Sequence, residues 1–198
     1  MKAKETAVIL IEFQNEFCKP NGKLYELVKA ELLRQNTVAN AVRLAAEARV
    51  KGCLIVHCPF VFDGQWMDKH SVSGILQKIK EAGSFRRGTW GAQLIEELRP
   101  LRGDVLLHGK RALSGFSNTE LKDVLKERGI RNVACAGLLS NVCVEATARA
   151  AYDRGYQVVV VKDATAAATR LHQDYFERET APVLGAGLTV EEFLRALE

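Results

Sequence analysis

Five short runs of apolar residues are spaced along the chain and predict buried β-strands. They are continuously apolar instead of alternating with polar residues, which is typical of parallel strands covered on both faces. The runs are Ala7–Ile11, Cys53–Val56, Val105–Leu107, Val133–Ala136 and Val158–Val161. None approaches the 18 or more residues that a membrane span needs, so we expect no membrane association.

Helical patterns lie between these runs, and several carry capping signals. Ser117 and Glu120 form a predicted capping box at the start of one helix, and Thr189 would cap the last one. The predicted helices are Thr37–Lys51, a segment near Ala92–Leu98, Ser117–Arg128, Asn141–Arg154 and Val190–Leu197. Strands that alternate with helices predict an α/β fold of three layers, with a central mostly parallel sheet of five to six strands and helices on both faces.

Two segments are longer than the usual connections of such a fold, namely Phe13–Asn36 and Pro59–Thr89. The second is either a functional lid or a surface excursion with its own short helix. We find no internal repeat, low-complexity stretch or linker. The sequence therefore predicts a single domain over residues 1–198.

Composition and charge exclude several classes of protein. Apolar residues make up 47% and charged residues 26% of the chain, as in ordinary soluble globular proteins. The 28 basic residues exceed the 24 acidic ones by only four and are scattered, so no basic stripe indicates nucleic-acid binding. The first residues lack the long apolar stretch of a signal peptide, and we expect a cytoplasmic protein.

The chain has five cysteines at irregular spacing, which argues against a disulfide framework. They are either small buried hydrophobes or include one nucleophile. Their sequence context distinguishes them: Cys18 lies in a loop, and only Cys143 lies at the predicted start of a helix.

Three residues with useful chemistry follow predicted strands. Glu12 follows the first, Lys110 follows the third, and Cys143 lies in the first turn of the helix after the fourth. Because ligands bind at the carboxyl ends of parallel strands, these residues are expected at one edge of the sheet. Each alone has a plainer interpretation, since a cysteine can simply pack and a strand-ending charge can simply be solvated.

This combination of residues predicts acyl transfer. The helix dipole, with Ser140 or Asn141 as the cap, and a nearby Lys110 would both lower the pKa of the Cys143 thiol. Glu12 would move the proton, and backbone N–H groups would stabilise an oxyanion.

Three separated motifs occur at Val8–Phe17, Lys110–Leu121 and Gly137–Ala148, and they are followed by Gly155–Ala164 and by His172. Together these stretches resemble the isochorismatase-like cysteine hydrolase superfamily, which often has a histidine at the position of His172. The resemblance implies an α/β fold with a parallel sheet and a catalytic triad of Glu12, Lys110 and Cys143. It also implies a cis peptide between Leu138 and Leu139 and an oxyanion hole formed by the N–H groups of Leu139 and Cys143.

The chain departs from the family pattern at Glu12, where the family usually has aspartate. Glutamate keeps the carboxylate and reaches one methylene further, and we expect it to retain the proton-transfer role.

Nicotinamidases of this superfamily also carry a metal site after the second strand. Here Asp63 lacks the following histidine, His57 and Cys58 face opposite sides of a strand, and only His70 remains nearby. We therefore expect no metal and no cofactor.

The resemblance leaves the reaction partly open. Isochorismatase itself cleaves a vinyl ether, and its relatives often lack the cysteine, so Cys143 favours hydrolysis of a C–N bond in an amide, carbamoyl or lactam substrate. The alternatives are an isochorismatase-type ether hydrolase and a catalytically silent binding protein of the same fold. The partner would be a small-molecule substrate, and relatives imply a homodimer or homotetramer.

Three aromatic residues are candidates for the wall of the substrate pocket, namely Phe17, Phe60 and Trp90. Trp90 has an alternative interpretation as a residue that packs in the core or an interface.

Overall fold

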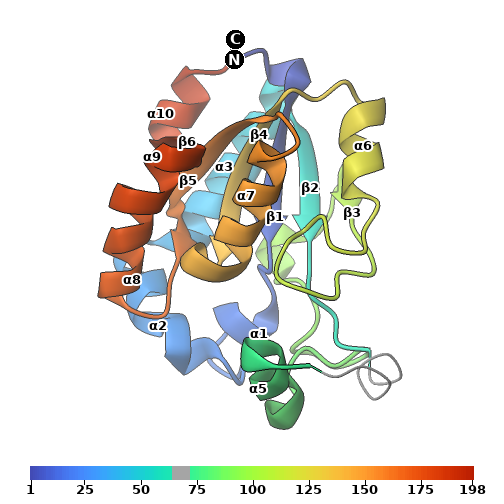
Figure 1. Ribbon diagram of the computed structural model, residues 1–198, viewed down its shortest axis with the longest axis vertical. Coiled ribbons are helices and arrows are strands. Elements are labelled where there is room, and N and C mark those ends of the chain that lie inside the picture. Colours follow the sequence, from blue (N-terminus) through green and yellow to red (C-terminus); the bar gives the residue numbers. More distant parts are fainter. Residues whose placement is uncertain (64–71) are drawn as a thin grey trace.

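The computed structural model describes residues 1–63 and 72–198. Within them, six strands form one parallel sheet in the order β3-β2-β1-β4-β5-β6. The strands are β1 Thr6–Ile11, β2 Leu54–Cys58, β3 Val105–Leu106, β4 Asn132–Leu138, β5 Gln157–Ala166 and β6 Gly185–Leu188. Helices lie on both faces of this sheet, with α7 and α3 on opposite sides (Figure 1). The predicted fold class is confirmed.

All five apolar runs fall on strands, and the sixth strand is β6. Its sequence, Gly-Ala-Gly-Leu, contains no β-branched residue and gives a weak strand signal. Pairing with Val158–Val161 of β5 supplies what local propensity lacks. β6 is therefore a product of tertiary pairing more than of its own sequence.

The helices match the predictions unevenly. They are α1 Asn15–Cys18, α2 Tyr25–Arg34, α3 Thr37–Lys51, α5 Gly74–Ala82, α6 Leu121–Glu127, α7 Glu145–Tyr152, α8 Arg170–Tyr175, α9 Ala181–Leu184 and α10 Val190–Arg195. α3 has the predicted bounds, because Gly52 adopts a left-handed conformation that ends it. The predicted cap of α10 is confirmed, since Thr189 and Glu192 form a reciprocal capping box.

Three helix predictions need correction. The capping box of Ser117 is not formed: α6 starts at Leu121, whose N–H donates to the Thr119 hydroxyl, while the Glu120 carboxylate accepts from the His108 N–H. The segment near Ala92–Leu98 contains only a 3₁₀ turn at Glu96–Leu98. The predicted helix Asn141–Arg154 is divided into a π-helical turn, Ser140–Val144, and α7.

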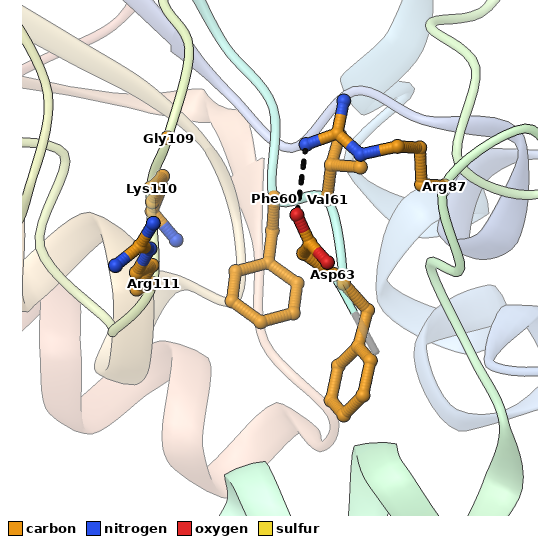
Figure 2. Close-up of a pocket in the computed structure, with 8 residues that line it drawn as sticks. Phe60, Val61, Asp63, Arg87, Gly109, Lys110 and Arg111 are labelled. Atoms are coloured by element: carbon orange, nitrogen blue, oxygen red, sulfur yellow. Dashed lines mark ion pairs between the residues drawn. The ribbon is translucent and has the colours of Figure 1, made fainter. Parts of the chain in front are cut away.

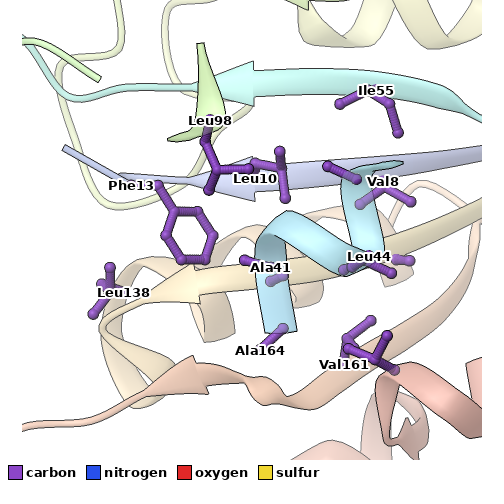
Figure 3. Close-up of a cluster of buried hydrophobic side chains, with 14 of the residues drawn as sticks. Val8, Leu10, Phe13, Ala41, Leu44, Ile55, Leu98, Leu138, Val161 and Ala164 are labelled. Carbon is purple, nitrogen blue, oxygen red and sulfur yellow. The ribbon is translucent and has the colours of Figure 1, made fainter. Parts of the chain in front are cut away.

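The core has two layers because β1 is buried on both faces. Val8 and Leu10 belong to one cluster with Ala41 and Leu44 of α3 (Figure 3). The alternate residues of β1 belong to a second cluster, which includes Leu121 and Leu125 of α6 and Ala148 of α7; they are Ala7, Ile9 and Ile11. This period-2 division explains why the strands read as continuously apolar.

The carboxyl edge of the sheet is kept free of the chain termini. The N–H of Ala3 donates to the carbonyl of Glu198 at 3.0 Å, so both ends lie together at the opposite edge (Figure 1). α1 and α5 lie beyond the carboxyl ends of the strands. No helix in the described part of the chain is long and apolar enough to cross a membrane.

Candidate active site

Glu12, Lys110 and Cys143 meet at the carboxyl edge of the sheet. The Lys110 ammonium forms an ion pair with the Glu12 carboxylate and lies 3.9 Å from the Cys143 sulfur. All three are buried: the side chains of Lys110 and Glu12 are 0% and 4% exposed, and Cys143 is 8% exposed. The structure therefore brings together the three residues that the sequence singled out.

The sheet topology explains this meeting. Chain connections run from β1 to β2 and β3 on one side, and β4 returns to the other side of β1. The ends of β1 and β4 therefore form a topological switch point, where open α/β sheets bind ligands. Glu12 follows β1 with a positive φ of 57°, a conformation that turns the chain out of the strand direction. Its N–H still donates to the carbonyl of Cys58 at 3.1 Å.

Cys143 lies in the π-helical turn that follows β4. The peptide bond between Leu138 and Leu139 is cis. The Leu139 carbonyl accepts hydrogen bonds from the N–H groups of Val142 and Val144, on either side of Cys143. The predicted cap at Ser140 or Asn141 is wrong, because Leu139 precedes the turn and no side chain caps it. The Ser140 hydroxyl instead donates to the Gln173 side-chain carbonyl at 2.7 Å.

The electrostatics of the thiol differ from the sequence-based expectation. Burial raises the pKa of Cys143 well above its usual value, and the Glu12 carboxylate, which accepts a hydrogen bond from the thiol, raises it further. Lys110 lowers this pKa, but its effect is smaller. The predicted low pKa of Cys143 is therefore wrong for the resting site.

Lys110 stays charged despite its burial. Burial is the largest single effect and would lower the pKa of its ammonium, but the adjacent Glu12 carboxylate, together with the sulfurs of Cys143 and Cys58, outweighs burial and raises this pKa. The resting site thus contains a neutral thiol beside an ion pair, with a carboxylate already in place to accept the thiol proton.

A narrow cavity adjoins the Cys143 sulfur. Besides Glu12, Lys110 and Cys143, its walls are formed by apolar residues: Phe17, Phe60, Ile75, Leu76, Ile79, Ala112, Leu113, Leu139 and Val142. Two of the three predicted pocket aromatics, Phe17 and Phe60, belong to this wall.

Trp90 does not line this cavity, so its place in the substrate pocket stays a prediction. The residue is 46% exposed. The Trp90 carbonyl accepts a hydrogen bond from the Asn15 side chain, and the neighbouring Gly91 carbonyl accepts one from the Glu16 N–H. The backbone of this loop therefore faces α1, and the indole is left at the surface.

Sequence reasoning missed the contribution of α5. Pro59–Thr89 contains a short helix, as one of the two alternatives for this segment predicted. Ile75, Leu76 and Ile79 of that helix line the cavity beside Cys143. The signal was present in the sequence, since these residues occupy positions i, i+1 and i+4 of a helical face.

Phe60 also lines a second cavity, which Figure 2 shows together with Lys110, Arg111, Asp63 and Arg87. There, the guanidinium of Arg87 pairs with the Asp63 carboxylate at 3.6 Å. The Phe60 ring centroid lies 5.0 Å from the Lys110 ammonium, within the range of a cation–π contact.

The buried Gln14 holds the backbone of Phe60. The Gln14 side chain accepts from the Phe60 N–H at 2.9 Å and donates to the Phe60 carbonyl at 2.8 Å. It also donates to the carbonyl of Ala92. Gln14 is thus a positioning residue that the sequence did not reveal, because its partners are distant along the chain.

The residues considered for a metal site are dispersed. His57 hydrogen-bonds to Asp104 at 3.1 Å, Asp63 pairs with Arg87, and His70 lies outside the described residues. Over residues 1–63 and 72–198, no group of three or more His, Cys, Asp or Glu side chains is arranged to hold a metal ion. All five cysteines are free and buried.

Comparisons with known proteins find relatives in sequence and in structure. The ureidoacrylate amidohydrolase RutB of Caulobacter segnis is 33% identical over 175 residues, which cover 82% of this chain and 72% of that protein. A cysteine hydrolase from Pseudomonas syringae is similar in structure with a TM-score of 0.86 and 28% identity, covering 98% of this chain and 93% of that one. The N-carbamoylsarcosine amidase of Thermoplasma acidophilum has a TM-score of 0.72 and 30% identity, covering 97% and 98%.

The isochorismatase domain matches residues 6–192, almost the whole chain, and this span includes Glu12, Lys110 and Cys143. With the parallel sheet and the similarity to solved cysteine hydrolases, the match shows that this chain belongs to the isochorismatase family.

Proposed function

We propose that this protein is an amidohydrolase that cleaves a C–N bond of a small amide, carbamoyl or lactam substrate through a thioester on Cys143. The observation that carries the proposal is the meeting of Glu12, Lys110 and Cys143 beside a cavity. The relatives named above as a ureidoacrylate amidohydrolase and an N-carbamoylsarcosine amidase support C–N cleavage over cleavage of a vinyl ether.

The first half-reaction forms the thioester. Glu12 accepts the thiol proton as the Cys143 sulfur attacks the substrate carbonyl carbon, and a tetrahedral oxyanion forms. The backbone N–H groups of Leu139 and Cys143 donate hydrogen bonds to this oxyanion. Glu12 then gives the proton to the leaving nitrogen, the C–N bond breaks, and an amine or ammonia departs.

The second half-reaction regenerates the thiol. Glu12 accepts a proton from a water molecule, which attacks the thioester carbonyl, and the same N–H groups stabilise the second oxyanion. Collapse of this intermediate breaks the C–S bond and releases the acid, and the thiolate regains the proton from Glu12. Lys110 keeps the Glu12 carboxylate in place and offsets the negative charge that passes between carboxylate and sulfur.

A substrate screen with matched variants tests this function. Wild type, Cys143→Ala and Cys18→Ala would be assayed against amides, ureas and lactams for release of ammonia or amine. We expect turnover by wild type and Cys18→Ala, because Cys18 does not line the cavity, and none by Cys143→Ala. Acid quenching during turnover should trap an acyl group on Cys143, detectable by mass spectrometry.

The same variants separate the alternatives. An ether hydrolase would act on isochorismate, and its activity would survive in Cys143→Ala. A silent binding protein would turn over no member of the panel. The expected homodimer or homotetramer stays a prediction, which analytical ultracentrifugation of the wild-type protein checks.

A further inference from the structure

The cavity beside Cys143 is lined almost entirely by apolar residues. Apart from Glu12, Lys110 and Cys143, all of its lining residues are apolar. Its volume of about 20 Å³ leaves room for only one water-sized sphere. A substrate group that enters this space must therefore displace apolar side chains and lose contact with water.

The charges at this cavity are already balanced. The ammonium of Lys110 is paired with the Glu12 carboxylate, and no other cationic residue lines the cavity in the part of the chain that the structure describes. A carboxylate brought next to Cys143 would lose its hydration without gaining a partner. Burial of an unpaired charge is strongly unfavourable, so this wall discriminates against anionic groups.

α5 supplies the partly exposed side of this wall. Ile75, Leu76 and Ile79 line the cavity from one helix, and all three side chains remain partly exposed. No residue of α5 is fully buried, in contrast to α3, so α5 tolerates substitution better than the core does. Gln77 lies on the same helix but is exposed and does not line the cavity.

The second cavity differs in chemistry and place. It contains Arg87 and Arg111, but neither Glu12 nor Cys143 lines it (Figure 2). The guanidinium of Arg87 is paired with Asp63. Lys110 lines both cavities, but the two arginines of the second cavity do not line the cavity that adjoins the Cys143 sulfur.

We infer that the enzyme selects substrates whose substituent beside the scissile carbonyl is neutral, apolar and compact, and that Ile75, Leu76 and Ile79 of α5 set this selectivity. The inference rests on the proposed function where it concerns hydrolysis of a substrate. The preference for neutral over anionic groups is a property of the cavity itself. This preference would distinguish the chain from the relatives named for ureidoacrylate, because ureidoacrylate is a carboxylate.

Alkylation of Cys143 tests the charge selectivity without any need for turnover. Iodoacetamide and iodoacetate are matched in size and differ in charge, and mass spectrometry locates the label. At pH 9, the ratio of the two rate constants at Cys143 should exceed the ratio for N-acetylcysteine by at least about tenfold, because only the neutral reagent enters the apolar cavity without loss of hydration.

Variants of α5 test whether its residues cause the preference of the cavity for the neutral reagent. Leu76→Arg should lower the ratio of rate constants at Cys143 at least about fivefold, since the new guanidinium offers the carboxylate a partner. Ile79→Arg is a second variant with the same expectation, should the first fail to fold. Gln77→Arg adds the same charge outside the cavity and should leave the ratio within about twofold of wild type.

Hydrolysis of matched amides distinguishes failure of this inference from failure of the proposed function. Butyramide and succinamate differ at one end, a methyl against a carboxylate, and wild type should prefer butyramide in kcat/KM. If the alkylation ratio is high but neither amide is hydrolysed, nor any member of the wider screen, the selectivity holds and the hydrolase proposal fails. A wild-type alkylation ratio equal to or below that of N-acetylcysteine overturns the inference, whatever the hydrolysis shows.

Discussion

At the scale of single residues, burial and two opposite charges set the pKa of the Cys143 thiol. Burial and the Glu12 carboxylate hold its pKa up, while the Lys110 ammonium, 3.9 Å from the sulfur, lowers it. In the resting site the proton therefore stays on sulfur. We infer that activation comes when Glu12 takes this proton during attack, and not from a thiolate that exists beforehand.

Glu12→Gln distinguishes two effects of the carboxylate, namely acceptance of the thiol proton and the raised pKa of Cys143. Turnover should fall about 10²–10⁴-fold, because glutamine cannot accept the thiol proton. Alkylation of Cys143 by iodoacetamide at pH 7 should become faster, because the charge that raises the thiol pKa is removed and Lys110 is no longer opposed. Both rates are measured on the same preparation.

Glu127→Gln, on the exposed face of α6, is the matched control and should change neither rate. Unchanged turnover in Glu12→Gln would contradict the proton-transfer role. Slower alkylation of that variant would contradict the electrostatic account.

The pH dependence of alkylation follows from the direction of the Cys143 pKa. Because this pKa lies well above 9, the thiolate fraction of the wild type rises with pH over the whole neutral range. The rate constant with iodoacetamide should increase about tenfold per pH unit between pH 7 and 9. A plateau below pH 8 would show that the thiol is activated in the resting site.

At the scale of elements, the pairing of β1 with β4 positions the site. Gly137 of β4 lies opposite Ile11, the residue before Glu12. Its φ is 136°, and a Cβ atom there would lie 2.0 Å from the Ile11 carbonyl oxygen. Only glycine permits this approach, which brings the turn with Cys143 next to Glu12.

Gly137→Ala should lower the free energy of unfolding by about 3 kcal/mol or more, because the added methyl collides with backbone that cannot move independently. Gly129→Ala is the matched comparison. Its φ of 63° is also left-handed, but no atom lies within 4 Å of the added Cβ, so we expect a loss of roughly 1 kcal/mol. Urea denaturation of both variants checks the difference, and equal losses would show that the contact with Ile11 is unimportant.

At the scale of the whole molecule, buried thiols link stability to pH. Burial raises the pKa values of Cys18, Cys58 and Cys135 to about 12, and that of Cys53 to about 11. In the unfolded chain these thiols titrate near 9. Between pH 9 and 12 the unfolded state therefore binds fewer protons than the native state, and stability falls as pH rises.

The free energy of unfolding should accordingly be lower at pH 10 than at pH 7 by a few kcal/mol, since each group contributes roughly 1 kcal/mol per pH unit in this range. Below about pH 8 the thiols add little pH dependence, because they are protonated in both the folded and the unfolded state. Urea denaturation at both pH values under reducing conditions measures the loss.

Cys135→Ala identifies the source of this loss. The variant has its own cost, which is the same at both pH values, but its loss between pH 7 and pH 10 should be smaller than that of wild type by roughly 1 kcal/mol. An identical loss in both proteins would mean that other groups cause the alkaline destabilisation.

The sequence by itself determined every strand of the sheet except β6, and it determined the three residues at the carboxyl edge. The apolar runs are local signals, and strands buried on both faces need them wherever they occur. Because parallel strands end at one edge, Glu12, Lys110 and Cys143 were expected together without knowledge of any distance. β6 lacked such a local signal, and its four residues form a strand only against β5.

Only the tertiary structure decided the surroundings of these residues. The pKa of Cys143 depends on burial and on the distances to two charges, which residue types do not encode. The wall contributed by Ile75 and Leu76, and the exposure of Trp90, depend on where α5 and the loop with Trp90 lie relative to the sheet. Local sequence specifies which segments form strands and helices, but the burial and charge at a site are sums over contacts between segments far apart in the chain.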